Sequence, residues 1–173
     1  MKEIIIPVKL DAKTFRRFCR FDMFRLRKRW VRPVAFALIL IAFAVAALFS
    51  RRPEAGLIAA VLLVVGLGLP LVYFGTYFSQ VNLQAERLGL ASARLVYTVK
   101  LDFDGVRVVN HLKKEDAQTV SWSEVQAAFR RKGCVYLYVS PVKAYLLPDG
   151  QGGVAPDALW AYLNARIPEK CRG

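Results

Sequence analysis

The sequence predicts an α+β membrane protein in which a two-helix transmembrane hairpin precedes a small antiparallel β-sandwich or open barrel with a terminal α-helix. Two observations lead to this prediction. Of the 26 Lys and Arg and 13 Asp and Glu residues, only Arg51, Arg52 and Glu54 lie between Pro33 and Phe78. In the C-terminal half the apolar residues alternate as they do in strands, and the last segment returns to helical spacing. With 55% hydrophobic residues distributed in this way, the chain is neither disordered nor purely soluble.

Residues 1–32 form a basic N-terminal segment. Lys2 to Leu10 is rich in isoleucine and valine and predicts a short strand, in which Pro7 favours an edge position. Asp11 is placed to cap a helix that begins at Ala12. On a helical wheel that helix has an apolar stripe formed by Phe15, Phe18, Cys19, Met23, Leu26 and Trp30. Either the stripe lies in the headgroup layer of an anionic leaflet, or it packs on the soluble domain and the arginines are only topology signals.

Two apolar blocks predict membrane-spanning helices over residues 33–49 and 55–78. Each is close to the roughly 20 residues that cross about 30 Å of hydrocarbon, where a chain must satisfy its own backbone groups. The short connection makes the helices antiparallel neighbours. A cleavable signal peptide is a poorer interpretation, because the first apolar run begins only after 32 residues. We expect packing within the hairpin, with dimerisation as the alternative, through small residues four positions apart: Ala42 and Ala46, Gly56 and Ala60.

Charge predicts the orientation of this hairpin. Only Arg51 and Arg52 lie in the connection, whereas eight basic residues precede the first helix: Arg16, Arg17, Arg20, Arg25, Arg27, Lys28, Arg29 and Arg32. The positive-inside bias therefore places both termini in the cytoplasm and the chain in the cell (inner) membrane. With a net charge of +13, the chain is expected to face the anionic inner leaflet rather than nucleic acid. The candidate contacts with the membrane surface are Arg16, Arg20, Arg27 and Lys28.

The residue types that transport and catalysis need are sparse. No ionisable side chain lies within either predicted span, which argues against transport. The single histidine, His111, has no sequence cue that links it to a serine nucleophile, and Cys19, Cys134 and Cys171 are too scattered for a metal cluster. We therefore expect no enzyme activity, no cofactor and no metal. Lipidation of Cys19 is a minor alternative to an ordinary semi-buried thiol.

Asp104-Gly105 is a strong signal for a β-hairpin. A two-residue turn at this dipeptide would place Phe103 opposite Val106 and Leu101 opposite Val108 on one face. On the other face it would place Asp102 opposite Arg107, a favourable charge pair. Turn chemistry and side-chain pairing therefore predict the same register.

Residues 79–92 are expected to be a helical extension and linker, and residues 93–168 the C-terminal β domain. After the hairpin, four further strands are predicted at residues 118–122, 125–131, 134–139 and 143–147. A terminal helix follows, with Pro156 in its first turn and Pro168 as its end. About six antiparallel strands with one helix describe a small sandwich or open barrel.

The C-terminal region also carries a family resemblance. The matching stretches are Ser121-Trp122-Ser123-Glu124-Val125, Val135-Tyr136-Leu137-Tyr138, Ala144-Tyr145-Leu146-Leu147-Pro148 and the terminal helix. With the basic start and the apolar hairpin, the chain resembles the YcxB-like family of bacterial membrane proteins. That resemblance implies a C-terminal domain similar to bacterial pleckstrin-homology domains. Where the family often has a basic residue after the last strand, this chain has Asp149 and Gly150.

Two further groups of residues are candidate contact sites. Arg130, Arg131 and Lys132 lie at a predicted turn between strands, where they either touch lipid headgroups or form a solvated turn. Tyr136 and Tyr138 share one strand face, which is either core, exposed, or covered by the Lys2 to Leu10 strand. If that face is open, it is a candidate partner-binding strand.

These observations favour a non-catalytic, membrane-anchored module that interacts with protein or lipid. The alternative is an accessory or regulatory subunit of a larger membrane complex, and an enzyme is the third hypothesis. The protein partner is not identified by the sequence, and a homo-oligomer is left open.

Overall fold

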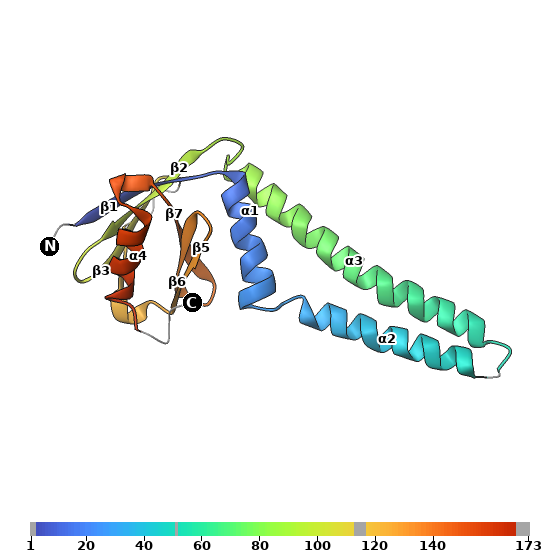
Figure 1. The fold of residues 1–173 in the computed structure, drawn as a ribbon. Helices are drawn as coiled ribbons and strands as arrows, with labels where there is room; N and C mark the ends of the chain where they lie inside the picture. The colour runs from blue at the N-terminus through green and yellow to red at the C-terminus, as the bar shows by residue number, and fades with distance from the viewer. Residues whose placement is uncertain (1–2, 51, 113–116, 169–173) are drawn as a thin grey trace. The chain divides into compact units, whose positions relative to one another are not determined.

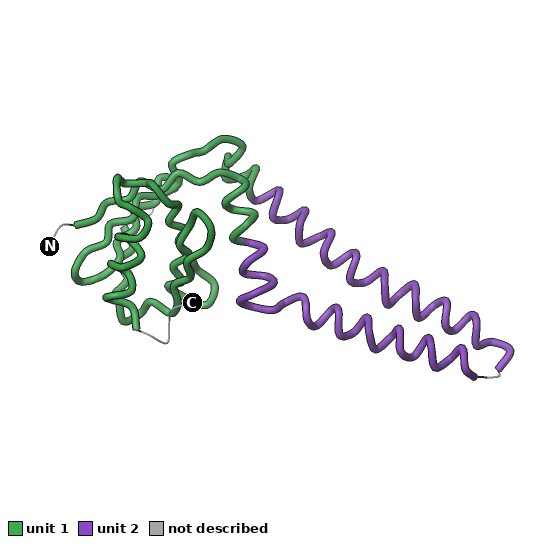
Figure 2. Tube along the Cα trace, viewed as in Figure 1, with its two compact units in different colours: residues 1–18, 85–173 green, residues 19–84 purple. Residues whose placement is uncertain are grey.

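The structure is a computed structural model that describes residues 3–50, 52–112 and 117–168. Arg51 and Cys171, which enter the sequence-based expectations, lie outside the described residues. The chain divides into two compact units, one made of residues 1–18 and 85–173 and the other of residues 19–84 (Figure 2). The first unit is therefore discontinuous in sequence, and the second is inserted into it.

The first unit contains, among its described residues, seven strands in two antiparallel sheets, followed by a helix (Figure 1). The four-stranded sheet has the order β1 (Ile4–Leu10), β2 (Arg94–Leu101), β3 (Gly105–Asn110) and β4 (Gln118–Ser121). The three-stranded sheet has the order β5 (Ala127–Arg131), β6 (Cys134–Ser140) and β7 (Lys143–Pro148). Helix α4 (Pro156–Asn164) follows, with Pro156 in its first turn as expected.

The first strand of the chain belongs to this unit. β1 pairs with β2, with Ile4 opposite Leu101 and Val8 opposite Tyr97. It is an edge strand, as Pro7 favoured, and its outer edge is partly covered: the Gln151 side chain accepts a hydrogen bond from Lys9 N (2.7 Å) and donates one to Lys9 O (2.8 Å). The boundary of 93–168 expected for the β domain therefore omits a strand of its sheet.

The core of the first unit is built by residues from both sheets and the terminal helix. Alternate residues of the strands point inward, as the period of two requires. Fully buried apolar side chains include Ile6, Val8, Val99, Leu101, Val106, Leu137, Leu147 and Leu163. Burying each such side chain contributes about 1.5–3 kcal/mol relative to leaving it exposed. Because Ile6 and Val8 are among them, β1 is part of the core and not an appendage.

The β2–β3 hairpin differs from its predicted register. Leu101 lies opposite Val106 and Lys100 opposite Arg107, so the pairing of Asp102 with Arg107 is wrong by two residues. The connection is longer than expected: Asp102 N donates to Gly105 O (3.0 Å), and Phe103 at the tip is 72% exposed. A shift of two residues leaves the same side chains facing inward, so the hydrophobic pattern alone does not distinguish the two registers.

The reason for the longer loop lies in Gly105. This glycine is the first residue of β3 and lies opposite Ser121 of β4. A Cβ atom at this position would lie 2.3 Å from Val120 O. Close approach of the neighbouring strand, and not a left-handed turn conformation, therefore requires glycine here.

The second unit begins within α1 (Ala12–Phe21), whose first part belongs to the first unit. Asp11 caps this helix as predicted, because its Oδ1 accepts from Thr14 N at 2.9 Å. A π-helical turn (Asp22–Leu26) follows, and Lys28 adopts a left-handed conformation with φ of 47°. The predicted continuous amphipathic helix up to Trp30 is therefore interrupted, since a non-glycine residue in this conformation ends a right-handed helix.

Two long apolar helices make up most of the rest of the second unit: α2 (Val31–Phe49) and α3 (Ala55–Arg87), whose last three residues belong to the first unit. Their most apolar 18-residue windows have mean hydropathies of 2.4 and 2.6, and each window is only 11% buried. Both helices are long and apolar enough to cross a membrane, whereas a core helix of a soluble protein is mostly buried. Helix α3 continues nine residues past Phe78 to Arg87, so the predicted helical extension makes up most of residues 79–92.

The small residues that are buried in this unit are not those expected. Ala42, Ala46, Gly56 and Ala60 are all exposed. The buried small residues are Ala37, Ala44, Ala55, Ala59 and Gly66. A Cβ atom on Gly66 would lie 3.1 Å from Leu40 Cβ, so α2 and α3 approach closely at this point.

Candidate functional site

Four cations surround a cavity at the start of α2. The cavity has a volume of about 460 Å³ and is lined by Arg27, Lys28, Arg29, Arg32, Pro33 and Tyr73. All of these residues belong to the second unit, and Tyr73 comes from α3. This cavity, which we call the basic cavity, gathers two of the predicted surface contacts, Arg27 and Lys28, with two arginines that the prediction did not single out.

The backbone around the basic cavity is held by hydrogen bonds. Arg27 N donates to Asp22 O (2.9 Å), Arg29 N donates to Met23 O (3.1 Å), and Val31 N donates to Lys28 O (3.0 Å). The Arg27 guanidinium also forms an ion pair with Asp22, with 3.0 Å between Nε and Oδ2. The π-helical turn and the left-handed Lys28 thus present consecutive cations along one short, hydrogen-bonded segment.

Aromatic side chains lie next to the same segment. Trp30 Nε1 donates to Phe24 O (3.1 Å), and the Phe24 ring stacks on Phe74 with centroids 6.2 Å apart. Tyr77 donates through its hydroxyl to Cys19 O at 2.8 Å. Tryptophan and tyrosine near the ends of long apolar helices are typical of the boundary between hydrocarbon and water.

The other predicted surface contacts on the N-terminal segment are placed separately. Arg16 is exposed on α1, and Arg20 places its guanidinium carbon 6.0 Å from the centre of the Phe78 ring. Neither lines the basic cavity. The sequence-based set of Arg16, Arg20, Arg27 and Lys28 therefore does not form one site.

The structure also divides the Arg130, Arg131 and Lys132 cluster. Arg130 forms an ion pair with Asp157 of α4, at 2.6 Å between Nη2 and Oδ1. Arg131 has its guanidinium carbon 6.0 Å from the centre of the Phe129 ring, and Lys132 is exposed at the turn between β5 and β6. Because Arg130 is engaged with the terminal helix, three adjacent cations are not presented together at a loop tip.

Tyr136 and Tyr138 are core residues. Each is only 3% exposed. The Phe18 ring of α1 lies over both, with centroid distances of 5.3 Å and 6.1 Å. Helix α1, and not the first strand, covers this face, so the two tyrosines do not form an open partner-binding strand in this structure.

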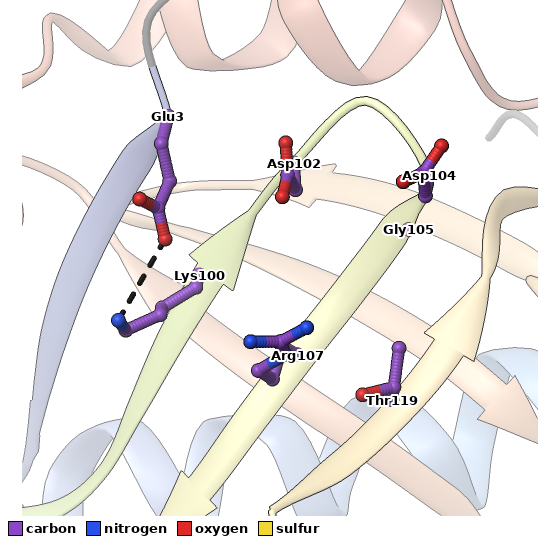
Figure 3. Close-up of a pocket in the computed structure, with 7 residues that line it drawn as sticks. All are labelled: Glu3, Lys100, Asp102, Asp104, Gly105, Arg107 and Thr119. Carbon is purple, nitrogen blue, oxygen red and sulfur yellow. Dashed lines mark ion pairs between the residues drawn. The ribbon is translucent and has the colours of Figure 1, made fainter.

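A second depression lies on the first unit, beside the β2–β3 loop (Figure 3). It has a volume of about 40 Å³. Among the residues that line it, Glu3 and Lys100 form an ion pair, with 3.7 Å between Oε1 and Nζ. Asp102, Asp104 and Arg107 also line it, so its charges are mixed. A space of this size holds about one or two water molecules and no larger ligand.

The titratable groups that catalysis could use are placed apart. His111 Nε2 lies 2.8 Å from Thr98 Oγ1, on the neighbouring strand, whereas the Ser121 hydroxyl bonds with that of Ser123 (3.0 Å). In the part of the chain that the structure describes, no group of three or more His, Cys, Asp or Glu residues is placed to hold a metal ion.

The two described cysteines have weakly acidic thiols. Burial raises the pKa of Cys19 to about 11 and that of Cys134 to about 12. Both thiols are therefore protonated near neutral pH, and a protonated thiol is a poor nucleophile.

Sequence reasoning missed Asp22, Arg29, Arg32 and Tyr73 as neighbours of the basic cavity. Arg29 and Arg32 were counted only as topology signals. Tyr73 lies on the other helix of the hairpin, more than 40 positions from Arg32, so no local pattern connects them. The available signal was its place near the end of the second apolar block, where interfacial aromatic residues concentrate.

Comparisons of the chain with known protein families, with curated proteins and with solved structures found no match. The class of protein is therefore defined by the fold alone. The chain is of the mixed α+β class, and its two long apolar helices are inserted between the first two strands of the first unit, which we call the β unit.

Proposed function

We propose that this chain is a non-catalytic interaction module anchored in the cell (inner) membrane. Helices α2 and α3 cross the bilayer with both termini in the cytoplasm. The β unit is a pleckstrin-homology-like domain of the YcxB-like type, and its binding partner is a protein or a lipid at the inner leaflet.

The observation that carries this proposal is the point of insertion. The segment with both apolar helices leaves the β unit after β1 and returns before β2, and its ends meet where Ala12 N donates to Leu90 O at 2.9 Å. A hairpin that crosses and recrosses a bilayer has both of its ends on one side. The inserted hairpin would therefore hold one folded domain at one membrane surface through two covalent connections.

The exposure of apolar side chains supports the membrane location. Phe36, Leu38 and Phe43 on α2 are 48%, 61% and 63% exposed, and Leu57, Val64 and Leu71 on α3 are each more than 70% exposed. An apolar surface of this extent in water would cost about 25 cal/mol for each Å². Lipid removes that cost, and the eight-to-two contrast of basic residues favours a cytoplasmic β unit.

The domain assignment is supported by analogy. Two packed antiparallel sheets followed by a terminal helix are what the YcxB-like resemblance implies. Domains of this kind serve recognition elsewhere, and we propose the same role here.

Cysteine labelling tests the topology. In a background without the three native cysteines, Glu54→Cys lies in the turn between the helices and Lys132→Cys lies at an exposed turn of the β unit. An impermeant maleimide should label Glu54→Cys in intact cells and Lys132→Cys only after permeabilisation. The reverse pattern would overturn the proposal. Cys134 itself is unsuitable as a probe because it is buried.

A second candidate function, as a subunit of a larger membrane complex, is favoured by exposed apolar side chains on two loops. Phe103 and Val142, at the tips of two hairpin loops, are 72% and 81% exposed. Exposed apolar side chains at loop tips suit contact with another protein. Photo-crosslinkers at these two positions, with buried Tyr136 as the control, separate the functions. A stoichiometric integral-membrane partner that remains bound in mild detergent would favour the complex over the stand-alone module.

A further inference from the structure

The basic cavity carries more positive charge than its neighbours neutralise. Arg27 is paired with Asp22. Within the described residues, Lys28, Arg29 and Arg32 form no ion pair with a carboxylate. Three cations therefore line a concave space of about 460 Å³ without a counter-charge from these parts of the chain.

The shape of the site is set by the backbone before any ligand arrives. Two backbone hydrogen bonds hold the segment: Arg27 N donates to Asp22 O, with 2.9 Å between the atoms, and Arg29 N donates to Met23 O, with 3.1 Å. Lys28, with a φ of 47°, adopts the left-handed conformation between the π-helical turn and α2. A site whose backbone is already ordered loses less conformational entropy on binding than a flexible basic tail does.

The position of the cavity along the helices points to a ligand at a membrane surface. Arg32 and Pro33 lie in the first turn of α2, and Tyr73 lies on α3 before the last aromatic residues of the apolar block. Trp30 follows Arg29 in the sequence, and its indole N–H donates a hydrogen bond to Phe24 O. If α2 and α3 span the bilayer as proposed above, these aromatic residues place the cavity at the level of the lipid headgroups.

We propose that the basic cavity binds the phosphate group of an anionic phospholipid of the inner leaflet whose headgroup carries two negative charges. Arginine guanidinium groups donate paired hydrogen bonds to phosphate oxygens, and the Tyr73 hydroxyl adds a neutral donor. The volume is far above the ~30 Å³ that one water molecule occupies, so the cavity admits a glycerophosphate group. Two negative charges neutralise the three cations more completely than the one charge of an ordinary phosphodiester.

The test uses the full-length chain in a neutral detergent with native mass spectrometry as the readout. Four ligands are titrated: dihexanoyl phosphatidic acid, dihexanoyl phosphatidylglycerol, dihexanoyl phosphatidylcholine and inorganic phosphate. We expect one phosphatidic acid per chain, weaker binding of phosphatidylglycerol, and no saturable binding of phosphatidylcholine. Inorganic phosphate should bind more weakly than phosphatidic acid because it lacks the apolar chains.

Two double variants with the same loss of charge locate the site. Arg29→Gln with Arg32→Gln should weaken phosphatidic acid binding by about tenfold or more, because it removes two of the three cations that have no ion-pair partner among the described residues. Lys13→Gln with Arg17→Gln removes two exposed cations outside the cavity and should change the affinity for phosphatidic acid by less than about twofold. Arg29→Lys with Arg32→Lys keeps the charge and should retain part of the affinity, which separates lost contacts from lost folding.

Several results would overturn the assignment. An equal loss of affinity for phosphatidic acid in both glutamine variants would mean that the lipid is attracted by the surface charge in general and not bound in the cavity. Equal affinity for all three lipids, or no bound lipid, would exclude a two-charge headgroup site. Inorganic phosphate binding as tightly as phosphatidic acid would assign the site to free phosphate. A reversed labelling pattern at Glu54→Cys and Lys132→Cys would instead refute the proposed function while leaving the measured binding as it stands.

Discussion

Tyr97 is a single residue that connects the two sheets. Its side chain on β2 is 8% exposed, and its hydroxyl donates to Leu146 O (3.0 Å) and accepts from Leu146 N (2.7 Å) on β7. One hydroxyl thus satisfies both backbone groups of a buried residue. Burial also raises the pKa of Tyr97 well above its usual value, so the hydroxyl keeps its proton and can continue to donate.

Tyr97→Phe is expected to destabilise the β unit by about 1–3 kcal/mol, because it leaves a buried donor and a buried acceptor without a partner. The measurement is the free energy of unfolding of the full-length chain by urea in a mild detergent. Tyr162→Phe is the matched control, since its hydroxyl makes only longer contacts, of 3.3 Å to Asp102 O and 3.5 Å to Leu101 O. Equal effects of the two substitutions would contradict this role for Tyr97.

A second prediction at the residue scale concerns Cys134 and the dependence of stability on pH. Its pKa is raised from 9.0 to about 12, chiefly by burial. Above pH 9 the unfolded chain releases this proton while the folded chain keeps it. The unfolded state then binds fewer protons, so the stability of the β unit falls as pH rises, by at most about 1.4 kcal/mol per pH unit.

The difference between the wild type and Cys134→Ala isolates that contribution. Urea unfolding between neutral pH and the region above pH 9 should show a steeper loss of stability in the wild type than in the variant. The variant's lower stability at neutral pH, which reflects lost packing, does not affect this comparison of slopes. Identical slopes would show that Cys134 ionises equally in both states.

The β2–β3 hairpin shows how pairing at the scale of an element is decided. Asp104-Gly105 suggested a two-residue turn, but Gly105 is required inside the sheet because the carbonyl of Val120 passes too close for any side chain. The loop is displaced accordingly, and two cations, Lys100 and Arg107, face each other across the strands. Glu3 offsets part of this repulsion, because its Oε1 lies 3.7 Å from Lys100 Nζ.

The observed register predicts which charges are coupled. Arg107→Glu should stabilise the hairpin by about 0.2–1 kcal/mol, because it replaces a repulsive cross-strand pair with an attractive one. A double-mutant cycle with Lys100→Glu, measured by urea unfolding, should show coupling of similar size. The control cycle combines Arg107→Glu with Asp102→Lys and should show weaker coupling. Stronger coupling to position 102 would favour the two-residue turn instead.

At the scale of the whole molecule, the main feature is that the second unit, residues 19–84, interrupts the sequence of the first unit. β1 contributes buried Ile6 and Val8 to the β unit, yet both apolar helices separate it from β2 in the sequence. Phe18 of α1 covers the Tyr136 and Tyr138 rings of β6. The N-terminal segment is therefore a structural component of the β unit on both counts.

Fragment complementation checks this arrangement. Residues 85–173 alone are expected to be unstable and to aggregate, because they expose a sheet edge and the core face that β1 covers. Co-expression with a peptide of residues 3–18 should yield a soluble complex that unfolds cooperatively. The control peptide carries Ile6→Asp, which places a charge at a fully buried position, and should give no rescue. Cooperative folding of 85–173 alone would contradict the prediction.

The sequence by itself determined the two long apolar helices, the cap at Asp11, the general positions of most strands and the start of the terminal helix at Pro156. These features depend on local properties, namely hydropathy over about 20 residues, alternation over a few residues and the chemistry of single capping positions. Such properties act within a short stretch of chain, so reading along the sequence is enough to find them.

Only the tertiary structure decided that β1 joins β2, that the hairpin register is shifted by two residues, and that Tyr136 and Tyr138 are covered by Phe18. It also brought Tyr73 to the cations near Arg32, and it buried Ala37 and Gly66 in place of the expected small residues. Each of these outcomes depends on contacts between segments distant in sequence. Period-two and helical patterns show which residues share a face, but the partner of that face is set by how the whole chain packs.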